Sequence, residues 1–564
     1  MSAPAAVAPL LCPIEHLHRD LALAEAVTRG VFTCAGTKVE LGIEPDWLGA
    51  ELPADEEWRI EWVKFYYGLD LAWAYRTTGE ARFRSAWERL VGSFVAQVPP
   101  DADPSEVTAR RITNWLYAWP AFPETPLAES IGAQALHVRA NLTPERNHRT
   151  LELYALLLVA LALPGLDEGL CSFAVEALHR NLLADFRGDG VHREASTHYH
   201  MIALRSFVAA RENGRLYGVE FPVGYDERLA AACEFAVHCR RPDGTIPALS
   251  DADTGDYSEL LRLAGAPAPE RTHASFPDAG YFVQRSRWDR DARFAIFDCG
   301  PLGDGGHGHY DLLSLEAWAG GHALVLDPGR FTYAEGAPNW RRWFRGTAAH
   351  NTVTVDGCDQ TPYRRGRSDA RPATGRLLYR AGAPGLDVIA GEARSPLYDA
   401  VHRRRLAFVA GAYWIVEDRL TAPSPHRYDV RWHLAPDAQG LTRVLEGGVV
   451  LAPGVAIAIA GAEEIVLEDG WVSPRYGVKV PAPVVSASLG GVRDAVLVTL
   501  LAPCPGGAPP ALTCVECTPW ATVVRVGGVA PDGARDTLSL TDAGAVWERA
   551  TPAGERVDGA AVRA

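Results

Sequence analysis

The chain has 564 residues, of which 48% are apolar and 22% charged, a composition that excludes a disordered or collagen-like protein. Its net charge of −15 argues against nonspecific nucleic-acid binding, because that binding depends on Lys and Arg neutralising phosphates. The charge is uneven, since seven arginines and three aspartates lie between Arg341 and Arg371. This stretch is suited to an anionic ligand.

No segment of the sequence indicates a membrane span. The longest apolar run, Leu153–Leu163, has 11 residues, whereas a bilayer-crossing helix needs about 20. The N-terminus has no Lys or Arg before its apolar stretch and carries Pro4 and Pro9, unlike a secretory signal. We therefore expect a cytoplasmic protein, with a periplasmic location or export by another route as the alternative.

Residues 15–265 are predicted to form a helical domain. Apolar residues recur at helical spacing from Trp62 to Tyr75 and from Phe83 to Phe94, with a loop at Thr77–Gly79 between them. Further helices are expected near 106–122, 147–163, 168–185, 195–216 and 226–240. Long helices joined by short loops pack as antiparallel pairs, which predicts an incomplete (α/α) toroid.

Residues 275–564 show the alternation of β-strands, as in YFVQRS, ARFAIFD and NTVTVDG. The change of period follows a segment rich in Pro, Ala and Gly at 262–275. Many short strands without intervening helices predict a C-terminal antiparallel β-sandwich. Cys514 and Cys517 lie in this half, and we interpret them as ordinary thiols because no second Cys pair or nearby His completes a metal site.

The segment HGHYD contains the strongest metal-site signal. If it is extended, His307, His309 and Asp311 share one face. Asp327 ends the next apolar strand, and His350 begins the one after it. Two imidazoles and a carboxylate on adjacent strands suit a first-row divalent ion, and zinc is the ion we expect.

Two polar clusters lie in the helical half. On a helix, Glu194 and His198 would stack at i, i+4, and Tyr199 would offer a phenol whose proton moves easily if cations lower its pKa. Asn147 and His148 begin the most apolar helix, where an amide and an imidazole can hold a carboxylate. Each cluster is also compatible with a hydrogen-bonded helix face or a polar cap.

These residues stand in segments that resemble the heparinase II/III-like polysaccharide lyases over about residues 50 to 500. The most specific segments are HGHYDLLSLEAWAGGHALVLDPG and WRRWFRGTAAHNTVTVDGCDQ, supported by DGVHREASTHYH and RRITNWLYAW. The resemblance implies a toroid followed by a β-sandwich, and a lyase that cleaves uronic-acid-containing glycans by β-elimination. Its substrate would be an anionic polysaccharide.

The resemblance also implies residue roles. Asn147 and His148 would neutralise the substrate carboxylate, Tyr199 would act as acid, base or both, and His307 would be a partner base. Weaker candidates for proton transfer and substrate binding are Tyr333 and Arg345. The implied zinc ligands, mainly structural, are His309, Asp327 and His350, with Asp311 orienting His309.

Two alternatives remain open at this point. One is a zinc-dependent glycan hydrolase, in which a metal-bound water attacks and Tyr199 is structural. The other is a non-catalytic protein of the lyase fold associated with bacterial exopolysaccharide biosynthesis. Alginate and glycosaminoglycans are both substrate candidates.

Overall fold

The computed structural model describes residues 10–49, 52–364, 371–504, 509–518, 520–530 and 533–564. Backbone contacts divide the chain into two compact units. The first comprises residues up to Phe186, Met201–Ala231 and Arg262–Gly265, and the second comprises Arg187–His200, Ala232–Leu261 and the rest of the chain from Ala266. Two stretches of the helical half of the sequence therefore belong to the second unit.

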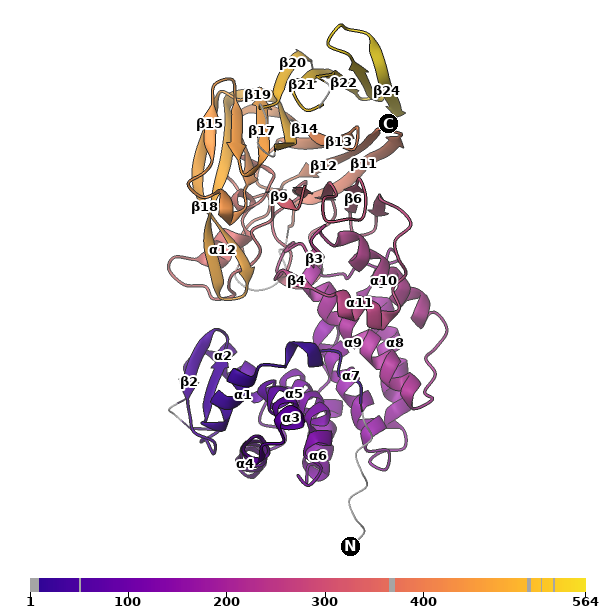
Figure 1. Ribbon diagram of the computed structural model, residues 1–564, viewed down its shortest axis with the longest axis vertical. Coiled ribbons are helices and arrows are strands. Elements are labelled where there is room, and N and C mark those ends of the chain that lie inside the picture. The colour runs from indigo at the N-terminus through magenta and orange to yellow at the C-terminus, as the bar shows by residue number, and fades with distance from the viewer. Residues whose placement is uncertain (1–9, 50–51, 365–370, 505–508, 519, 531–532) are drawn as a thin grey trace. The chain divides into compact units, whose positions relative to one another are not determined.

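The first unit is built from helices that pack against their neighbours in the sequence (Figure 1). They are α1 (Leu21–Thr28), α2 (Glu56–Val63), α3 (Tyr67–Thr78), α4 (Ala81–Gln97), α5 (Ser105–Ala118), α6 (Ala128–Ala140), α7 (Arg146–Ala162) and α8 (Leu170–Asp185), with a hairpin of β1 (Val31–Cys34) and β2 (Thr37–Glu40). Three helices have residues in both units: α9 (Thr197–Leu216), α10 (Tyr225–Cys239) and α11 (Ser258–Ala264). The predicted helical toroid is confirmed.

Local sequence explains most of these boundaries. Helix α3 ends where Gly79 takes the left-handed conformation, with φ of 71°, a common way to terminate a helix. The single helix expected from Trp62 to Tyr75 is wrong, because the chain breaks between α2 and α3, where Phe65 has φ of 59°. Apolar spacing continues through this break, so periodicity alone does not reveal it.

The second unit is a stack of antiparallel sheets (Figure 1). One five-stranded sheet contains β5 (Ala274–Phe276), β6 (Tyr281–Arg285), β7 (Phe294–Asp298), β8 (Leu315–Ala319) and β9 (His322–Val325). The ten-stranded sheet contains β10 (Val353–Val355), β11 (Thr374–Ala383), β12 (Leu386–Arg394), β13 (Val401–Val409), β14 (Tyr413–His433), β15 (Arg443–Leu445), β16 (Val449–Ala452), β17 (Gly454–Ala460), β18 (Glu464–Arg475) and β19 (Val478–Cys504). A third sheet has β20 (Ala511–Cys517), β21 (Ala521–Gly527), β22 (Arg535–Thr541), β23 (Gly544–Ala550) and β24 (Arg556–Arg563). Short pieces β3 (Thr245–Ile246), β4 (Gly255–Asp256) and α12 (Trp340–Arg345) complete the unit.

Two apolar cores hold these sheets together. One contains Phe297 of β7 together with Trp414 and Trp432 of β14, so it lies between the first sheet and the ten-stranded sheet. The other contains Ile415 of β14 and Trp547 of β23, so it lies between the ten-stranded sheet and the third sheet. Strand β14 therefore contributes alternate residues to cores on both of its faces, which confirms the predicted sandwich.

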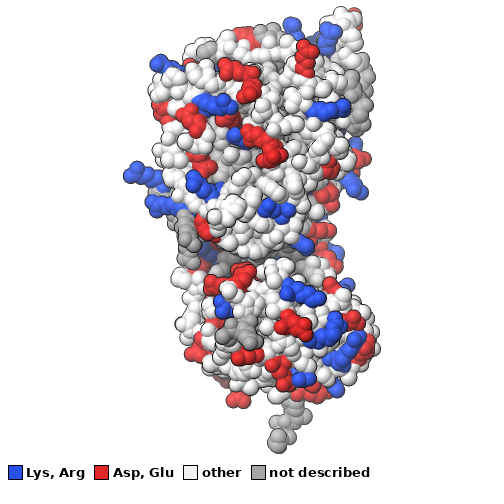
Figure 2. Space-filling view, turned by 90° about the vertical axis from the view of Figure 1, so that its left-hand side faces the viewer, with Lys and Arg blue, Asp and Glu red and all other residues white. Residues whose placement is uncertain are grey.

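The surface carries charges of both signs, and the most apolar helix is buried. On the face shown in Figure 2, acidic and basic side chains are interspersed on both units. Among the helices in the described part of the chain, none is long and apolar enough to span a bilayer. Helix α7 buries the apolar run Leu153–Ala162 inside the first unit.

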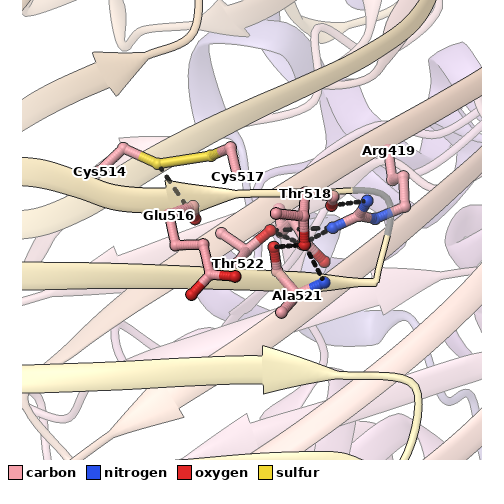
Figure 3. Close-up of a disulfide and its surroundings, with 8 residues drawn as sticks. Arg419, Cys514, Glu516, Cys517, Thr518, Ala521 and Thr522 are labelled. Carbon is pink, nitrogen blue, oxygen red and sulfur yellow. Dashed lines mark hydrogen bonds and ion pairs between the residues drawn. A yellow bond between two sulfur atoms is a disulfide. The ribbon is translucent and has the colours of Figure 1, made fainter.

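Cys514 and Cys517 form a disulfide in β20, which corrects their interpretation as ordinary thiols (Figure 3). In a regular strand, residues three apart are separated by about 10 Å and point to opposite faces. The pairing of β20 with β21 shifts register between Cys514 and Glu516, and the two Cα atoms lie only 6.9 Å apart. The β-bulge is the feature that the sequence pattern did not reveal.

Candidate active site

The segment HGHYD is a loop in the structure and not the strand that we expected. It follows a glycine-rich turn that approaches the segment Arg187–His200. A Cβ atom on Gly303 would lie 2.0 Å from the carbonyl oxygen of Glu194, so only glycine allows this approach. The turn thus brings His307 beside residues that lie more than a hundred positions earlier in the sequence.

Segment Arg187–His200 is tied to the second unit by side-chain hydrogen bonds to backbone. Ser196 donates to the carbonyl oxygen of Asp251 at 2.8 Å, and Thr197 donates to that of Pro247 at 2.6 Å. Helix α9 begins only at Thr197, so the expected helical stacking of Glu194 on His198 is wrong. Instead, Glu194 lies in the preceding turn, with Oε2 at 3.9 Å from Nε2 of His307.

Three of the predicted site residues, Tyr199, His307 and Tyr333, lie together in the second unit. The ring of Tyr199 stacks on that of His307 with centroids 3.9 Å apart. The Tyr199 and Tyr333 hydroxyls are hydrogen-bonded at 2.9 Å. All three side chains are only half-buried, so solvent and a ligand can reach them. A phenol and an imidazole in contact form a set of groups that can exchange protons with a bound molecule.

Arg330 controls the charge around the two phenols. Its Nη1 donates to the Tyr333 hydroxyl at 2.6 Å, and its Nε and Nη2 bind the two carboxylate oxygens of Asp253. Burial raises the pKa of Tyr199 to about 12, against the opposing charge of Arg330. The condition for an easily moved phenol proton, a pKa lowered by cations, is therefore not met, because desolvation outweighs the nearby cation.

Asp251 is the residue that sequence reasoning missed. One of its oxygens accepts from Nδ1 of His307 and the other contacts Nε2 of His309, each at 2.9 Å. Arg341 binds both oxygens, with Nη2 at 2.8 Å from Oδ2. Burial opposes ionisation, but Arg341 and the two imidazoles hold the pKa of Asp251 well below its usual range. The segment LSDADTG carries no motif that would have singled out this aspartate.

The predicted zinc ligands converge. His309, Asp327 and His350 are buried, and each offers a ligand atom within 4.8 Å of the others. His309 lies in a loop before β8, Asp327 lies just after β9, and His350 lies in the turn before β10. The three ligand candidates therefore lie in loops of two sheets, and not on three adjacent strands as expected. Within the described chain, Nδ1 of His309 and Nε2 of His350 are buried without a hydrogen-bond partner. Two imidazoles and a carboxylate with open nitrogen positions fit a divalent ion.

Further carboxyl groups surround this cluster. Burial raises the pKa of Asp311 to about 7 and raises that of Asp298 well above its usual value. A cation would relieve this crowding of acidic groups. Asp311 does not orient His309 as expected, because Asp251 occupies that position at Nε2 of the ring.

Arg345 does not reach the half-buried face of the site. It is 1% exposed, its Nε donates to the carbonyl oxygen of Gly308 at 3.0 Å, and its guanidinium covers the ring of Tyr310. Its predicted contact with substrate therefore has no support in the geometry. Arg345 lies on the buried face of α12 with Arg341 and Phe344, and this face directs it toward the loop that carries His307. Arg365 and Arg367 of the same arginine-rich stretch lie outside the described residues.

Asn147 and His148 belong to the first unit and begin helix α7. Asn147 is 7% exposed. His148 is exposed. Consecutive helical residues point about 100° apart, so the two side chains do not share a face. The roles of Asn147 and His148 both stay predictions.

Comparisons with known proteins agree with this architecture. The family model "Heparinase II/III N-terminus" matches residues 23–265, and "Heparinase II/III-like, C-terminal" matches residues 268–499. A heparin-sulfate lyase of Bacteroides stercoris is 23% identical over 77% of this chain and 73% of its own length. One of Pedobacter heparinus is 22% identical over 68% of this chain and 62% of its own length.

The crystal structure of a heparinase III superposes with a TM-score of 0.80 at 17% identity, covering 96% of this chain and 94% of that one. At this identity the superposition shows the shared fold. The two family models together extend over most of the chain and meet where the helical pattern gives way to strands. The chain belongs to the heparinase II/III-like family.

Proposed function

We propose that this protein is a polysaccharide lyase that cleaves a uronic-acid-containing glycosaminoglycan by β-elimination. The observation that carries the proposal is the contact of Tyr199 with His307, whose Nδ1 is held by the buried carboxylate of Asp251. Membership in the heparinase II/III-like family supports it, as do the names of the heparin-sulfate lyase relatives.

In the proposed reaction, His307 takes the proton from C5 of the uronic acid. Asp251 faces Nδ1, so that nitrogen carries the hydrogen and Nε2 keeps its lone pair for the substrate. Removing this proton builds negative charge next to a carboxylate that is already anionic. A donor is needed to offset that charge, and the assignment of Asn147 and His148 to this role stays a prediction from the resemblance.

Tyr199 then protonates the oxygen that leaves C4. Its raised pKa keeps the phenol protonated at neutral pH, which favours the role of acid over that of base. Tyr333 and Arg330 fix the orientation of the hydroxyl through the hydrogen bonds described above. The electron pair from the C5–H bond forms the C4–C5 double bond as the C4–O bond breaks.

We also propose that His309, Asp327 and His350 hold zinc in a structural role. The ion would supply a fixed positive charge among the buried carboxyl groups. All three side chains are at most 3% exposed, so this position is enclosed by protein and is not open to a polysaccharide. This burial disfavours the zinc-dependent hydrolase as the alternative function.

The test is digestion of heparan sulfate, heparosan, hyaluronan, chondroitin sulfate and alginate by purified protein. A lyase produces a conjugated unsaturated uronate that absorbs in the ultraviolet, and Tyr199→Phe is expected to abolish this product while the thermal midpoint stays near that of the wild type. New saturated ends would identify a hydrolase. Absence of cleavage on every substrate would favour the non-catalytic exopolysaccharide protein.

A further inference from the structure

The turn between β18 and β19 lies beside the residues proposed for proton transfer. The two strands pair as far as Arg475 opposite Val478, so Tyr476 and Gly477 form the turn. Tyr476 is half-buried and belongs to none of the sequence segments that predicted the site. Its ring contacts that of Tyr333, with centroids 5.6 Å apart. This contact joins the hairpin to the pair of phenols described above.

Backbone hydrogen bonds attach the turn to two segments of the site. The N–H of Gly477 donates to the carbonyl oxygen of Phe331 at 2.8 Å, in the segment that follows β9. On the other side, the N–H of Thr254 donates to the carbonyl oxygen of Pro474 at 3.0 Å, in the segment that precedes β4. The turn is therefore fixed to both segments.

The Tyr476 ring also lies against the guanidinium of Arg330. The Cζ atom of Arg330 is 5.4 Å from the centroid of the Tyr476 ring and 5.4 Å from that of the Tyr333 ring. Both distances are within the range of cation–π contacts, about 6 Å. The N–H groups of Arg330 already bind Asp253 and the Tyr333 hydroxyl. Tyr476 thus adds an aromatic contact to the hydrogen bonds that restrain this guanidinium.

The position of Arg330 bears on the direction in which the two phenol hydroxyls donate. A guanidinium only donates hydrogen bonds, so the Tyr333 oxygen accepts from Arg330. The Tyr333 hydrogen can then point to the Tyr199 oxygen, 2.9 Å away. In this arrangement the hydrogen of Tyr199 is left for a substrate oxygen. A displaced guanidinium would release Tyr333 and remove the preference for this direction.

Lys479 anchors the same hairpin to α12, independently of Tyr476. Its Nζ lies 3.4 Å from the centroid of the Trp471 ring on β18 and 4.1 Å from that of Trp340, the first residue of α12. The two tryptophan rings meet edge to face with centroids 5.6 Å apart, and Figure 1 shows β18 next to α12. The hairpin should therefore keep its place when the ring of Tyr476 is removed.

We propose that Tyr476 is a positioning residue, which holds Arg330 and Tyr333 so that Tyr199 presents its hydrogen to the leaving oxygen. The proposal rests on the proposed function for the role of Tyr199 as the acid. It gives Tyr476 no contact with substrate, so loss of the ring should lower kcat and leave KM near that of the wild type. A residue that binds substrate would raise KM instead.

The first test is the rate at which the full-length chain forms unsaturated product from heparan sulfate. Tyr476→Leu removes the ring, and kcat should fall about tenfold to a hundredfold, the larger value being that of a catalytic group displaced by about 1 Å. Tyr476→Phe keeps the ring and should restore most of the lost kcat. The matched control is Trp288→Leu, which removes another half-buried ring lying over an arginine, Arg285, at 4.2 Å. It should keep the kcat and KM of the wild type.

The leaving group separates a misplaced acid from general damage to the site. A uronide that carries a dinitrophenoxy group at C4 loses it as a stable anion, so no acid has to protonate it. Tyr476→Leu and Tyr199→Phe should both approach the wild-type rate on this substrate. His307→Ala lacks the proposed base and should stay slow on both substrates.

A second test needs no turnover. Carbon NMR of protein labelled at tyrosine Cζ reports the hydrogen bonding of each phenol, and Tyr199→Phe and Tyr333→Phe assign the two signals of interest. Both signals should shift in Tyr476→Leu and return in Tyr476→Phe. Trp288→Leu should leave them in place.

The proposal is overturned if Tyr476→Leu keeps the wild-type kcat, if it raises KM in place of lowering kcat, or if the Tyr199 and Tyr333 signals do not move. Tyr476→Met repeats both tests if Tyr476→Leu does not fold, and it must give the same results. Shifted signals without unsaturated product from the wild type would refute only the lyase function. Product formation with unmoved signals would refute only the positioning role.

Discussion

Replacing Asp251 with asparagine tests the arrangement on which the proposed reaction depends. The carboxylate accepts four hydrogen bonds: two from Arg341 and one each from His307 and His309. The amide of the Asp251→Asn variant would have the same shape, but its NH₂ group would face donors at one of the two oxygen positions. Two hydrogen bonds with charged character are then lost, at about 1.5–3 kcal/mol each.

The expected loss of stability is therefore about 3–6 kcal/mol, similar to the 3–5 kcal/mol typical of a broken buried ion pair. The catalytic effect is separate, because His307 would no longer be held with its hydrogen on Nδ1. We expect kcat to fall by at least about a hundredfold, the scale of a lost acid–base contribution, with little change in KM. The assay is initial-rate formation of unsaturated product on heparan sulfate, together with denaturant unfolding.

The matched control is Asp418→Asn. Asp418 is also buried and binds a histidine and an arginine, His402 at 2.6 Å and Arg404 at 2.6 and 2.9 Å, between β13 and β14. The Asp418→Asn variant should lose a comparable free energy of unfolding and keep the kcat of the wild type. The reasoning about Asp251 is refuted if its variant retains wild-type kcat, or if both variants lose kcat in proportion to stability.

His309→Ala should lower the zinc content and the thermal midpoint, measured by atomic emission and calorimetry, whereas His402→Ala should keep its zinc; equal metal in both variants would contradict the assignment. Burial opposes ionisation of Glu392, but hydrogen bonds from three arginines lower its pKa from 4.5 to about 2. The wild type should therefore have a larger free energy of unfolding than Glu392→Gln, with the full difference above pH 4.5 and none as the pH falls toward 2. A difference that does not change with pH would argue against this linkage. Gly303→Ala should impair turnover, because its Cβ would meet the Glu194 carbonyl and displace the turn before Tyr199; normal kinetics would show that the approach tolerates a side chain.

Several features of the site were readable in the sequence because they are local or are carried by motifs. Tyr199, His307 and the three zinc-ligand candidates lie in segments that the motifs identify without any geometry, and the structure brings the members of each set together. The local conformations were less accurate. HGHYD is a loop and Glu194 precedes its helix, because close approach at Gly303, and not side-chain alternation, determines the backbone there.

Other features depended on contacts between distant parts of the chain. Asp251 has no sequence pattern of its own, and only the folded chain brings it to His307, His309 and Arg341. The Tyr199 pKa could not be read from neighbours in the sequence, because burial, which outweighs the charge of Arg330, exists only after folding.

The change from helical to strand periodicity and the residue types available for proton transfer and metal binding were predictable from the amino-acid order, because both are properties of short segments. Folding sets which carboxylate holds each imidazole, which arginines are paired and which phenol is desolvated. Those properties depend on distances between segments and on exclusion of water, and neither is encoded in local spacing.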